Sequence, residues 1–360
     1  MSSEIHFGRY GAVGEAVLAR PKALNALSLD MIRELGPWLG KQQEDPEVAA
    51  IVVSGEGDRA FCAGGDVRAV YDAGIAIKAG GEGSVSDPGT MTADFFREEY
   101  NLNRAIHHCT KPYIAIVDGI SMGGGLGLSF HGLIRVITER TLFAMPETGI
   151  GLFPDVGGGW FLPRMPGETG TYLALTGHRC GPADAMYLGY GTHYVPSESL
   201  DALRSALGSL PADAGEEAVV SLLDTFGQDP GPAPIAERRS AIDDCFDGDT
   251  VQEIFDALAA HDTDWTRATL QTLGRMSPTS LAVTLAQLRM GRAMDYDEMV
   301  RIEYRLSQGC MRGHDFYEGI RALLVDKDKS PRWAPARLAD VTKEIVEDHF
   351  KPLGANDLSI

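Results

Sequence analysis

The sequence predicts an α/β protein with a mostly parallel sheet, followed by a helical C-terminal region. Over the first half of the chain, short apolar runs of strand length alternate with segments of helical periodicity. That alternation is typical of βαβ units and of a parallel sheet. From about residue 200 the strand-like runs disappear, and apolar residues recur at the spacing of helices. We therefore expect a core over residues 1–200 and a helical region over residues 201–360.

The first elements are predicted from their turn and cap residues. Residues 4–10 and 13–18 look like two strands separated by Gly11 and Ala12, which indicates a hairpin. Ser28 is well suited to cap the N-terminus of a helix over residues 29–43, because its hydroxyl can accept a hydrogen bond from the first helical turn. The chain is therefore expected to begin with two strands and an amphipathic helix.

Further along, the pattern separates buried strands, loops and helices. The glycine-rich stretch 79–89 is expected to be a loop, and residues 251–260 to be a helix. Pro211 and the stretch 228–234 mark linkers between helical pieces. Short apolar runs that are typical of buried strands occupy residues 49–53, 113–117 and 133–137.

Composition excludes some classes of partner. The formal net charge of −19 argues against binding to nucleic acid or to an anionic membrane surface, and no apolar run is long enough to span a bilayer. Five widely spaced cysteines without a CxxC pair suit a reducing compartment. The N-terminus has no basic leader with an apolar core. We expect a cytoplasmic protein, with a mature mitochondrial-matrix form left open.

Two carboxylates stand in an otherwise apolar, glycine-rich run over residues 145–159: Glu147 and Asp155. A buried acid is costly unless it is paired or used, so both are candidates for acid–base or nucleophilic catalysis. For Asp155, helix capping or pairing with Arg164 competes with this interpretation. For Glu147 the structural alternative is weaker, because nothing helical obviously begins there.

Two glycine clusters lie upstream, at residues 61–66 and 121–127. Glycine lets the backbone approach a ligand, and a helix that opens at the triple glycine 123–125 would present free N–H groups. Two such donors facing a carboxylate could stabilise an oxyanion formed from a carbonyl, which points to an enzyme. Close packing of helix on strand is the structural alternative, and Asp66 is expected to be a helix N-cap.

Ser121 lies in a G-x-S-x-G pattern after an expected strand, as a nucleophile elbow would require. A triad would need an acid and a histidine, for instance Asp155 with His193 or His314. Such short patterns recur by chance, and no donor loop of the His-Gly-Gly-Gly type precedes this one. We favour the interpretation that Ser121 is a small residue in a tight turn.

At this point the motifs match a known family. The joint presence of residues 60–66, 95–100 and the run 145–159 resembles the enoyl-CoA hydratase/isomerase (crotonase) superfamily over about residues 5–200. The similarity to thioester-hydrolysing members extends over nearly all of the chain, including residues 277–281, 304–316 and 329–333. The resemblance implies a spiral ββα core with a helical tail, and an acyl-CoA thioester as the ligand.

The resemblance assigns roles to five positions. The backbone N–H groups of Gly65 and Gly124 match the oxyanion-hole donors, and Glu147 matches the glutamate that hydrolases and hydratases share. Asp155 stands where hydratases usually carry glycine, and it matches the additional acid of the hydrolases. Gly127 occupies the position of the other hydratase glutamate, so a two-glutamate hydration mechanism lacks one partner here.

Other positions match substrate contacts. Glu99 matches a residue that contacts substrate. The early segment with Lys22, Ala23 and Leu24 resembles the stretch that holds the CoA adenine and pantetheine, and Ala63 is assigned to the same substrate-binding set. A solvated surface lysine is the structural alternative for Lys22.

The resemblance thus implies hydrolysis of 3-hydroxyisobutyryl-CoA, or of a related 3-hydroxyacyl-CoA, to the free acid and CoA, as a step of valine catabolism. Enoyl-CoA hydration or isomerisation on the same fold and non-catalytic acyl-CoA binding remain as alternatives. No metal or cofactor beyond the CoA of the substrate is expected, because no zinc, P-loop or dinucleotide motif occurs. The oligomeric state is open, a homo-oligomer included.

Overall fold

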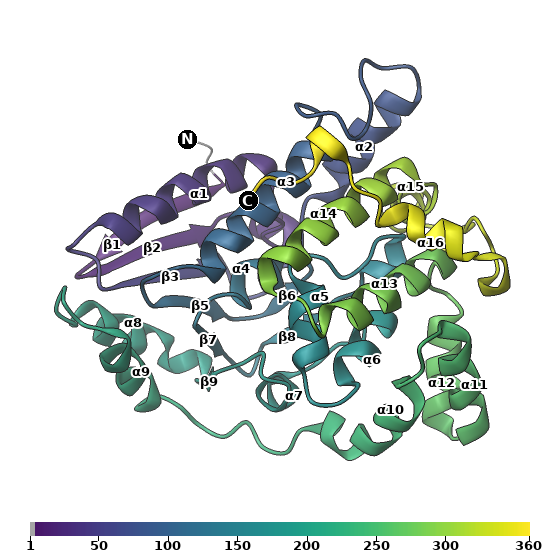
Figure 1. The fold of residues 1–360 in the computed structure, drawn as a ribbon. Coiled ribbons are helices and arrows are strands. Elements are labelled where there is room, and N and C mark those ends of the chain that lie inside the picture. The colour runs from purple at the N-terminus through teal and green to yellow at the C-terminus, as the bar shows by residue number, and fades with distance from the viewer. Residues whose placement is uncertain (1–3) are drawn as a thin grey trace. The chain divides into compact units, whose positions relative to one another are not determined.

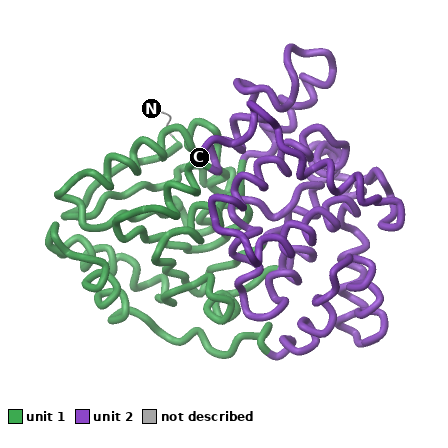
Figure 2. The backbone as a smooth tube through the Cα atoms, viewed as in Figure 1, with its two compact units in different colours: residues 1–65, 101–144, 179–236 green, residues 66–100, 145–178, 237–360 purple. Residues whose placement is uncertain are grey.

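The structure, a computed structural model, describes residues 4–360. Its chain divides into two compact units, each assembled from three separate segments (Figure 2). Unit 1 contains the described residues up to 65 together with 101–144 and 179–236, and unit 2 contains 66–100, 145–178 and 237–360. The expected boundary near residue 200 stays a prediction.

Unit 1 is built on a six-stranded sheet with the order β1-β2-β3-β5-β7-β9 (Figure 1). The β1–β2 hairpin is antiparallel, and every other pairing in this sheet is parallel. This confirms the hairpin and the mostly parallel sheet that the sequence predicted. The strands are β1 (Ile5–Tyr10), β2 (Val13–Leu18), β3 (Ala50–Gly55), β5 (Tyr113–Val117), β7 (Ile134–Ile137) and β9 (His193–Tyr194).

A second, three-stranded parallel sheet was not predicted. Its order is β4-β6-β8, with β4 (Ala60–Cys62), β6 (Ile120–Met122) and β8 (Leu142–Ala144). Three residues are too few for an alternating pattern to be recognised. The two glycine clusters begin within β4 and β6, and because these strands pair, the small sheet brings the clusters side by side.

The helices of unit 1 cover its sheet. The predicted cap at the first helix is confirmed, since the Ser28 hydroxyl accepts the Met31 N–H at 3.2 Å. Leu203 and Leu207 of α8 and Val219 and Leu223 of α9 pack on buried strand residues such as Val52. These helices are α1 (Leu29–Glu44), α4 (Gly124–Ser129), α7 (Pro182–Tyr187), α8 (Leu200–Gly208) and α9 (Glu216–Asp224).

Unit 2 is helical, apart from loops and 3-10 turns, in the part of the chain that the structure describes, and it includes a π-helical segment, η6 (Arg321–Val325). Asp66 caps its first helix by accepting the Ala69 N–H at 3.3 Å, and the loop expected at 79–89 separates α2 from α3. Its helices are α2 (Val67–Lys78), the first part of α3 (Met91–His107), α5 (Gly158–Phe161), α6 (Thr169–Thr176), α10 (Arg239–Phe246), α11 (Val251–His261), α12 (Asp264–Leu273), α13 (Pro278–Gly291), α14 (Tyr296–Arg312), α15 (Asp315–Ile320) and α16 (Lys343–His349).

Two helices, α13 and α14, form the centre of unit 2. α13 packs on α5 and α6, and α14 packs on α5 and α16. Ion pairs fix them to their neighbours: Arg289 of α13 donates to the buried Glu168 at 3.0 Å, and Arg305 of α14 donates to Asp357 through both Nε and Nη2. The helical C-terminal region that the sequence predicted is confirmed. Among the described residues, no helix is both long and apolar enough to cross a membrane.

Candidate active site

Three acidic side chains gather in the interior of unit 2. Glu99 lies on α3, Glu147 begins the 3-10 turn η2 (Glu147–Ile150), and Asp155 lies in the loop before α5. Their relative exposures are 2%, 5% and 5%. The carboxyl groups also act on one another electrostatically, so they lie close together. The structure therefore brings together the three acids that the sequence singled out.

Glu147 owes its position to a tight turn. The expectation that nothing helical begins there is wrong, because η2 starts at Glu147 after Pro146. The turn ends at Gly151, whose φ of 74° is left-handed, and a Cβ there would lie 2.2 Å from the backbone of Asp315. Glycine is therefore required at this close approach of η2 to α15.

Asp155 is held by Tyr100, one helical residue beyond Glu99. The Tyr100 hydroxyl donates to Asp155 Oδ2 at 2.8 Å, and Tyr100 itself is buried. The residue after Asp155, Val156, has a φ of 52°. A β-branched residue is uncommon in this region and costs on the order of 1–3 kcal/mol, so the surrounding structure has to stabilise the turn.

Neither structural alternative for Asp155 holds. The N-terminal amides of α5 are occupied by another acid: Gly157 and Gly159 donate to Glu303 of α14 at 2.6 and 2.9 Å. Arg164 donates to three backbone carbonyl oxygens, those of Trp160, Gly291 and Met294, and no hydrogen bond or ion pair joins it to Asp155 in the described chain. The Asp155 carboxyl group therefore neither caps α5 nor pairs with Arg164, and its side-chain contact is the hydrogen bond from Tyr100.

Burial dominates the electrostatics of this cluster. It raises the pKa of Asp155 to about 7, although the Tyr100 hydrogen bond pulls the pKa down. Burial, and then the charge of Asp155, raise the pKa of Glu99 and of Glu147 well above their ordinary range. An acid whose pKa lies near neutrality, as that of Asp155 does, can both give and take a proton at physiological pH, which is what general acid–base catalysis needs.

Two carboxyl oxygens in the cluster have no hydrogen-bond partner among the described residues. They are Glu99 Oε1 and Glu147 Oε2, and both are buried. A buried carboxyl oxygen without a partner is costly, so each of these two oxygens could accept a hydrogen bond from a substrate hydroxyl or a water. The site has the composition of a catalytic carboxylate centre.

The predicted oxyanion donors, Gly65 and Gly124, both lie in unit 1. The loop after β4 is fixed by the Leu27 N–H, which donates to the Gly64 carbonyl at 2.9 Å. Gly124 is the first residue of α4, and a Cβ on the next residue, Gly125, would lie 2.2 Å from the Cys62 carbonyl oxygen. Within the described chain, no backbone hydrogen bond occupies the N–H of Gly65 or Gly124. Both amides are available as donors, and glycine is what allows the close approach of α4 to β4.

The predicted CoA-contacting residues also lie in unit 1. Lys22 and Ala23 are exposed in the short 3-10 turn η1 (Pro21–Ala23), and Leu24 follows with a φ of 52°. Ala63 donates its N–H to the Leu24 carbonyl at 3.0 Å, so Ala63 lies next to the segment that contains Lys22, Ala23 and Leu24. The buried Asn25 fixes the turn, since its amide donates to the Ala60 carbonyl at 2.8 Å.

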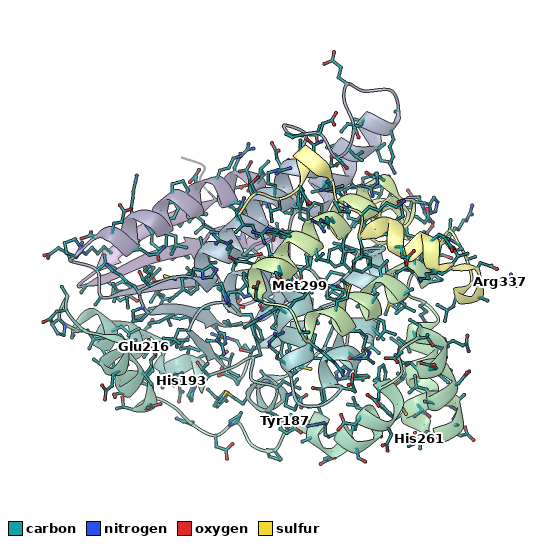
Figure 3. All side chains as sticks on the ribbon, viewed as in Figure 1. Tyr187, His193, Glu216, His261, Met299 and Arg337 are labelled. Atoms are coloured by element: carbon teal, nitrogen blue, oxygen red, sulfur yellow. The ribbon has the colours of Figure 1, made fainter. Side chains whose placement is uncertain are left out.

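Ser121 has no nucleophile geometry. It is fully buried in β6, and its Oγ accepts a hydrogen bond from the Tyr190 hydroxyl at 2.9 Å. His193, labelled in Figure 3, lies in β9 and contacts Thr192 and Asp224, while His314 in unit 2 contacts Asp315. The interpretation of Ser121 as a small structural residue agrees with these contacts.

Sequence reasoning missed Tyr100 and Glu303. Glu303 is the clearer omission, because it is fully buried among the apolar positions of α14, where Met299 and Leu306 are also buried. A charged residue in an otherwise apolar helix stripe is the signal that could have identified it. Met299 of the same helix (Figure 3) lies 2.5 Å from where a Cβ on Gly159 would be, so α5 packs tightly on α14.

The sequence of the chain matches a known protein family over nearly its whole length. A family model described as enoyl-CoA hydratase/isomerase matches residues 13–350. This chain belongs to the enoyl-CoA hydratase/isomerase family. The α/β fold class, with a ββα core and a helical C-terminal region, is thereby confirmed.

Relatives in this family that are similar to the chain over nearly its full length share one name, that of a hydrolase. The chain is 49% identical over 356 residues to "3-hydroxyisobutyryl-CoA hydrolase, mitochondrial" of Xenopus laevis, which covers 97% of this chain and 89% of that protein. It is 46% identical to the Homo sapiens protein of the same name over 362 residues, 99% of this chain and 91% of that one.

Solved structures give the same fold under different names. A carnitinyl-CoA dehydratase from Mycobacterium thermoresistibile has a TM-score of 0.89 at 39% identity, with 99% of each chain covered. An enoyl-CoA hydratase from Rhodobacter sphaeroides 2.4.1 has a TM-score of 0.88 at 36% identity, with 99% of this chain and 100% of that chain covered.

The expectation of a cytoplasmic location is wrong. The hydrolases named above, and that of Gallus gallus at 47% identity, are all designated mitochondrial, which contradicts it. The physical reason for the error is that scattered, unpaired cysteines report only a reducing environment and do not distinguish one reducing compartment from another.

Proposed function

We propose that this chain hydrolyses the thioester of 3-hydroxyisobutyryl-CoA, or of a related 3-hydroxyacyl-CoA, to the free acid and CoA. The observation that carries the proposal is the presence of Asp155 beside Glu147 in one buried acid cluster. The 49% identity to a full-length relative named for this hydrolysis supports it. The pathway proposed with it is valine catabolism, with a homo-oligomer as the proposed assembly.

The roles proposed for the backbone donors follow the resemblance. The thioester carbonyl accepts hydrogen bonds from the N–H groups of Gly65 and Gly124, which are fixed by the fold before the substrate arrives. Preorganised donors stabilise the tetrahedral oxyanion more than the ground state, and removal of one such donor typically costs about 3 kcal/mol. Lys22, Ala23, Leu24 and Ala63 are proposed to contact the CoA moiety.

Glu147 is proposed to cleave the thioester by one of two routes. In the first, a Glu147 carboxylate oxygen forms a bond to the carbonyl carbon, the C–S bond breaks and CoA thiolate departs. The product on the enzyme is a mixed anhydride between Glu147 and the acyl group, which water then hydrolyses. In the second, Glu147 takes a proton from water as its oxygen attacks the carbonyl carbon, and the thiolate leaves from the tetrahedral intermediate. Each route regenerates the enzyme and uses one water.

Asp155 and Glu99 are proposed to serve the acyl group and the leaving group. With a pKa of about 7, Asp155 is partly protonated at neutral pH and can donate a proton to the departing thiolate or a hydrogen bond to the 3-hydroxyl. Glu99 Oε1 has no partner in the described chain and can accept the hydrogen bond of the substrate hydroxyl. A hydroxylated acyl group would therefore satisfy polar atoms that an unsubstituted one would leave buried and unpaired.

Enoyl-CoA hydration or the reverse dehydration is the second candidate, because the two full-length structures at 36–39% identity carry those names. Hydration in this family, by the resemblance, uses two glutamates, and α4 offers only Gly127 at the second position. A glycine supplies no acid or base, so we favour hydrolysis.

One assay separates the candidates. Purified protein is incubated with 3-hydroxyisobutyryl-CoA, and thiol release is followed; crotonyl-CoA hydration is followed in parallel by loss of enoyl absorbance. Hydrolysis far faster than hydration is expected. Hydration at or above the hydrolysis rate would replace the proposal with the second candidate, and binding of CoA without either reaction would indicate a non-catalytic acyl-CoA-binding protein.

A further inference from the structure

A fourth buried acid, Glu303, contacts the backbone next to Asp155 rather than the substrate cluster. Its Oε2 accepts the Gly157 N–H at 2.6 Å, and its Oε1 accepts the Gly159 N–H at 2.9 Å. The Gln287 side-chain amide also donates to Oε1, at 3.0 Å. The carboxyl group therefore receives three N–H donors and has no exposed surface.

Gln287 extends this arrangement to the other side of Asp155. Its Nε2 donates to the Pro154 carbonyl at 2.9 Å as well as to Glu303. Pro154 and Gly157 thus bracket Asp155 and Val156, and both are bonded to this pair of side chains. We call Gln287 and Glu303, with their bonds to residues 154, 157 and 159, the α13–α14 clamp.

The segment inside the clamp needs external support. Val156 and Gly157 both have left-handed backbones, with φ of 52° and 86°. Valine rarely adopts this conformation, and a helix of four residues such as α5 cannot fix its own N-terminal turn. A short loop held in an unfavourable conformation by buried hydrogen bonds is the expected form of a preorganised catalytic position.

We propose that Glu303 is a positioning residue for Asp155. Through the α13–α14 clamp it holds the strained turn at Val156 and so fixes the direction of the Asp155 side chain toward Glu147 and Tyr100. This inference rests on the proposed hydrolase function, in which Asp155 touches the substrate. Glu303 has no part in the reaction itself, because both of its oxygens are occupied by N–H donors.

The test compares Glu303→Gln with a matched control, Glu168→Gln. Both glutamates are buried in unit 2 and receive several donors, but Glu168 bonds to Arg289, Arg292 and Thr171. Glutamine at position 303 keeps the size of the side chain but has a single acceptor oxygen. The Gly157 and Gly159 amides each bond to a different oxygen of Glu303, so one of these two bonds is lost in the variant. We expect kcat to fall by about 10- to 100-fold and KM to change less than about 3-fold, because a small misplacement of a catalytic group slows the chemical step. Glu168→Gln should lower the melting temperature and leave kcat within about 2-fold.

A second measurement does not depend on activity. Hydrogen exchange of the Gly157 and Gly159 amides in the ligand-free protein should be faster by about 10-fold or more in Glu303→Gln than in wild type, and unchanged in Glu168→Gln. If wild type fails to release CoA from 3-hydroxyisobutyryl-CoA while exchange responds as expected, the proposed function fails and the clamp stands. Unchanged exchange, or an equal loss of kcat in the control, would overturn the role of Glu303.

A weaker perturbation keeps the test valid if Glu303→Gln does not fold. Gln287→Met is similar in size and removes the bonds that Gln287 donates to Pro154 and to Glu303, while the two glycine amides still donate to Glu303. We expect kcat to fall about 3- to 10-fold with KM nearly constant. If Gln287→Met folds and keeps the wild-type kcat, the clamp has no positioning role.

Discussion

Replacement of Asp155 by asparagine should stabilise the protein while it impairs hydrolysis. Burial raises the Asp155 pKa from 3.8 to about 7, so the folded protein holds this proton roughly a thousandfold more tightly than the unfolded chain does. At about 1.36 kcal/mol for each tenfold change, ionised Asp155 lowers the free energy of unfolding by up to about 4 kcal/mol. Asparagine has a similar shape, can still accept the Tyr100 hydrogen bond and carries no charge.

The sign of the effect fixes its pH window. Between about pH 4 and pH 7 the folded state keeps a proton that the unfolded state releases, so wild-type stability falls as pH rises through this range and is level above it. The asparagine side chain does not titrate. The stability difference between Asp155→Asn and wild type should therefore be small near pH 4, grow up to pH 7 and stay constant at pH 8.

Thermal unfolding measured from pH 4 to pH 8 tests this. For 360 residues an unfolding entropy of about 0.8 kcal/mol/K converts 4 kcal/mol into a rise in melting temperature of about 5 °C at pH 8. Glu168→Gln is the control of opposite sign, because its hydrogen bonds outweigh burial and lower the Glu168 pKa. That variant should be less stable than wild type at pH 8, and the loss should shrink at low pH. If Asp155→Asn is no more stable than wild type at pH 8, Asp155 is not under electrostatic strain, and the reasoning about the acid cluster is refuted.

Three further predictions concern the chemistry and the fold around it. Glu147→Gln should lower kcat at least ~100-fold and leave CoA affinity intact, measured by thiol release and calorimetry; full activity would remove Glu147 from the mechanism. Ser121→Ala should retain activity within a few fold and wild type should resist fluorophosphonates, because the Tyr190 hydroxyl keeps its contact with Ser129; a loss of the size expected for a nucleophile would restore the elbow interpretation. Gly125→Ala should destabilise the protein by about 1–3 kcal/mol and slow hydrolysis, since a Cβ would lie 2.2 Å from the Cys62 carbonyl oxygen. If this variant keeps the wild-type melting temperature and hydrolysis rate, α4 can shift to make room for the methyl group.

The elements that sequence predicted well have strong local signals. The hairpin at 5–18 has a turn glycine between two stretches of strand length, and the first helix has a capping serine. The strand at 113–117 is apolar throughout and matches its predicted bounds. The strands β4, β6 and β8 were missed because three residues carry no period, and their pairing depends on contacts between distant segments.

The acid cluster was only partly predictable for the same reason. Glu147 and Asp155 share one glycine-rich run, so they are visible without any knowledge of the fold. Glu303 lies 148 positions beyond Asp155 in a helix whose local pattern is ordinary, and only packing of α14 on α5 joins them. The resemblance named positions that are expected to contact substrate, but it carried no information on the residues that hold those positions in place.

Burial alone does not separate a catalytic acid from a structural one. Glu168 and Glu147 are almost equally buried, at 6% and 5% exposure, yet their pKa values move in opposite directions. Burial raises the pKa of both, but Glu168 receives hydrogen bonds from Thr171, Arg292 and Arg289, which more than offset it. Glu147 has an oxygen without any partner in the described chain and an acidic neighbour, Asp155, instead of a base. A folded chain tolerates such an unpaired arrangement only if packing elsewhere stabilises it, and a ligand with donors and a reacting carbonyl would relieve it. The missing partner and the acidic neighbour, more than the burial, are therefore what distinguish Glu147 from the structural acid Glu168 and support the catalytic role proposed for it.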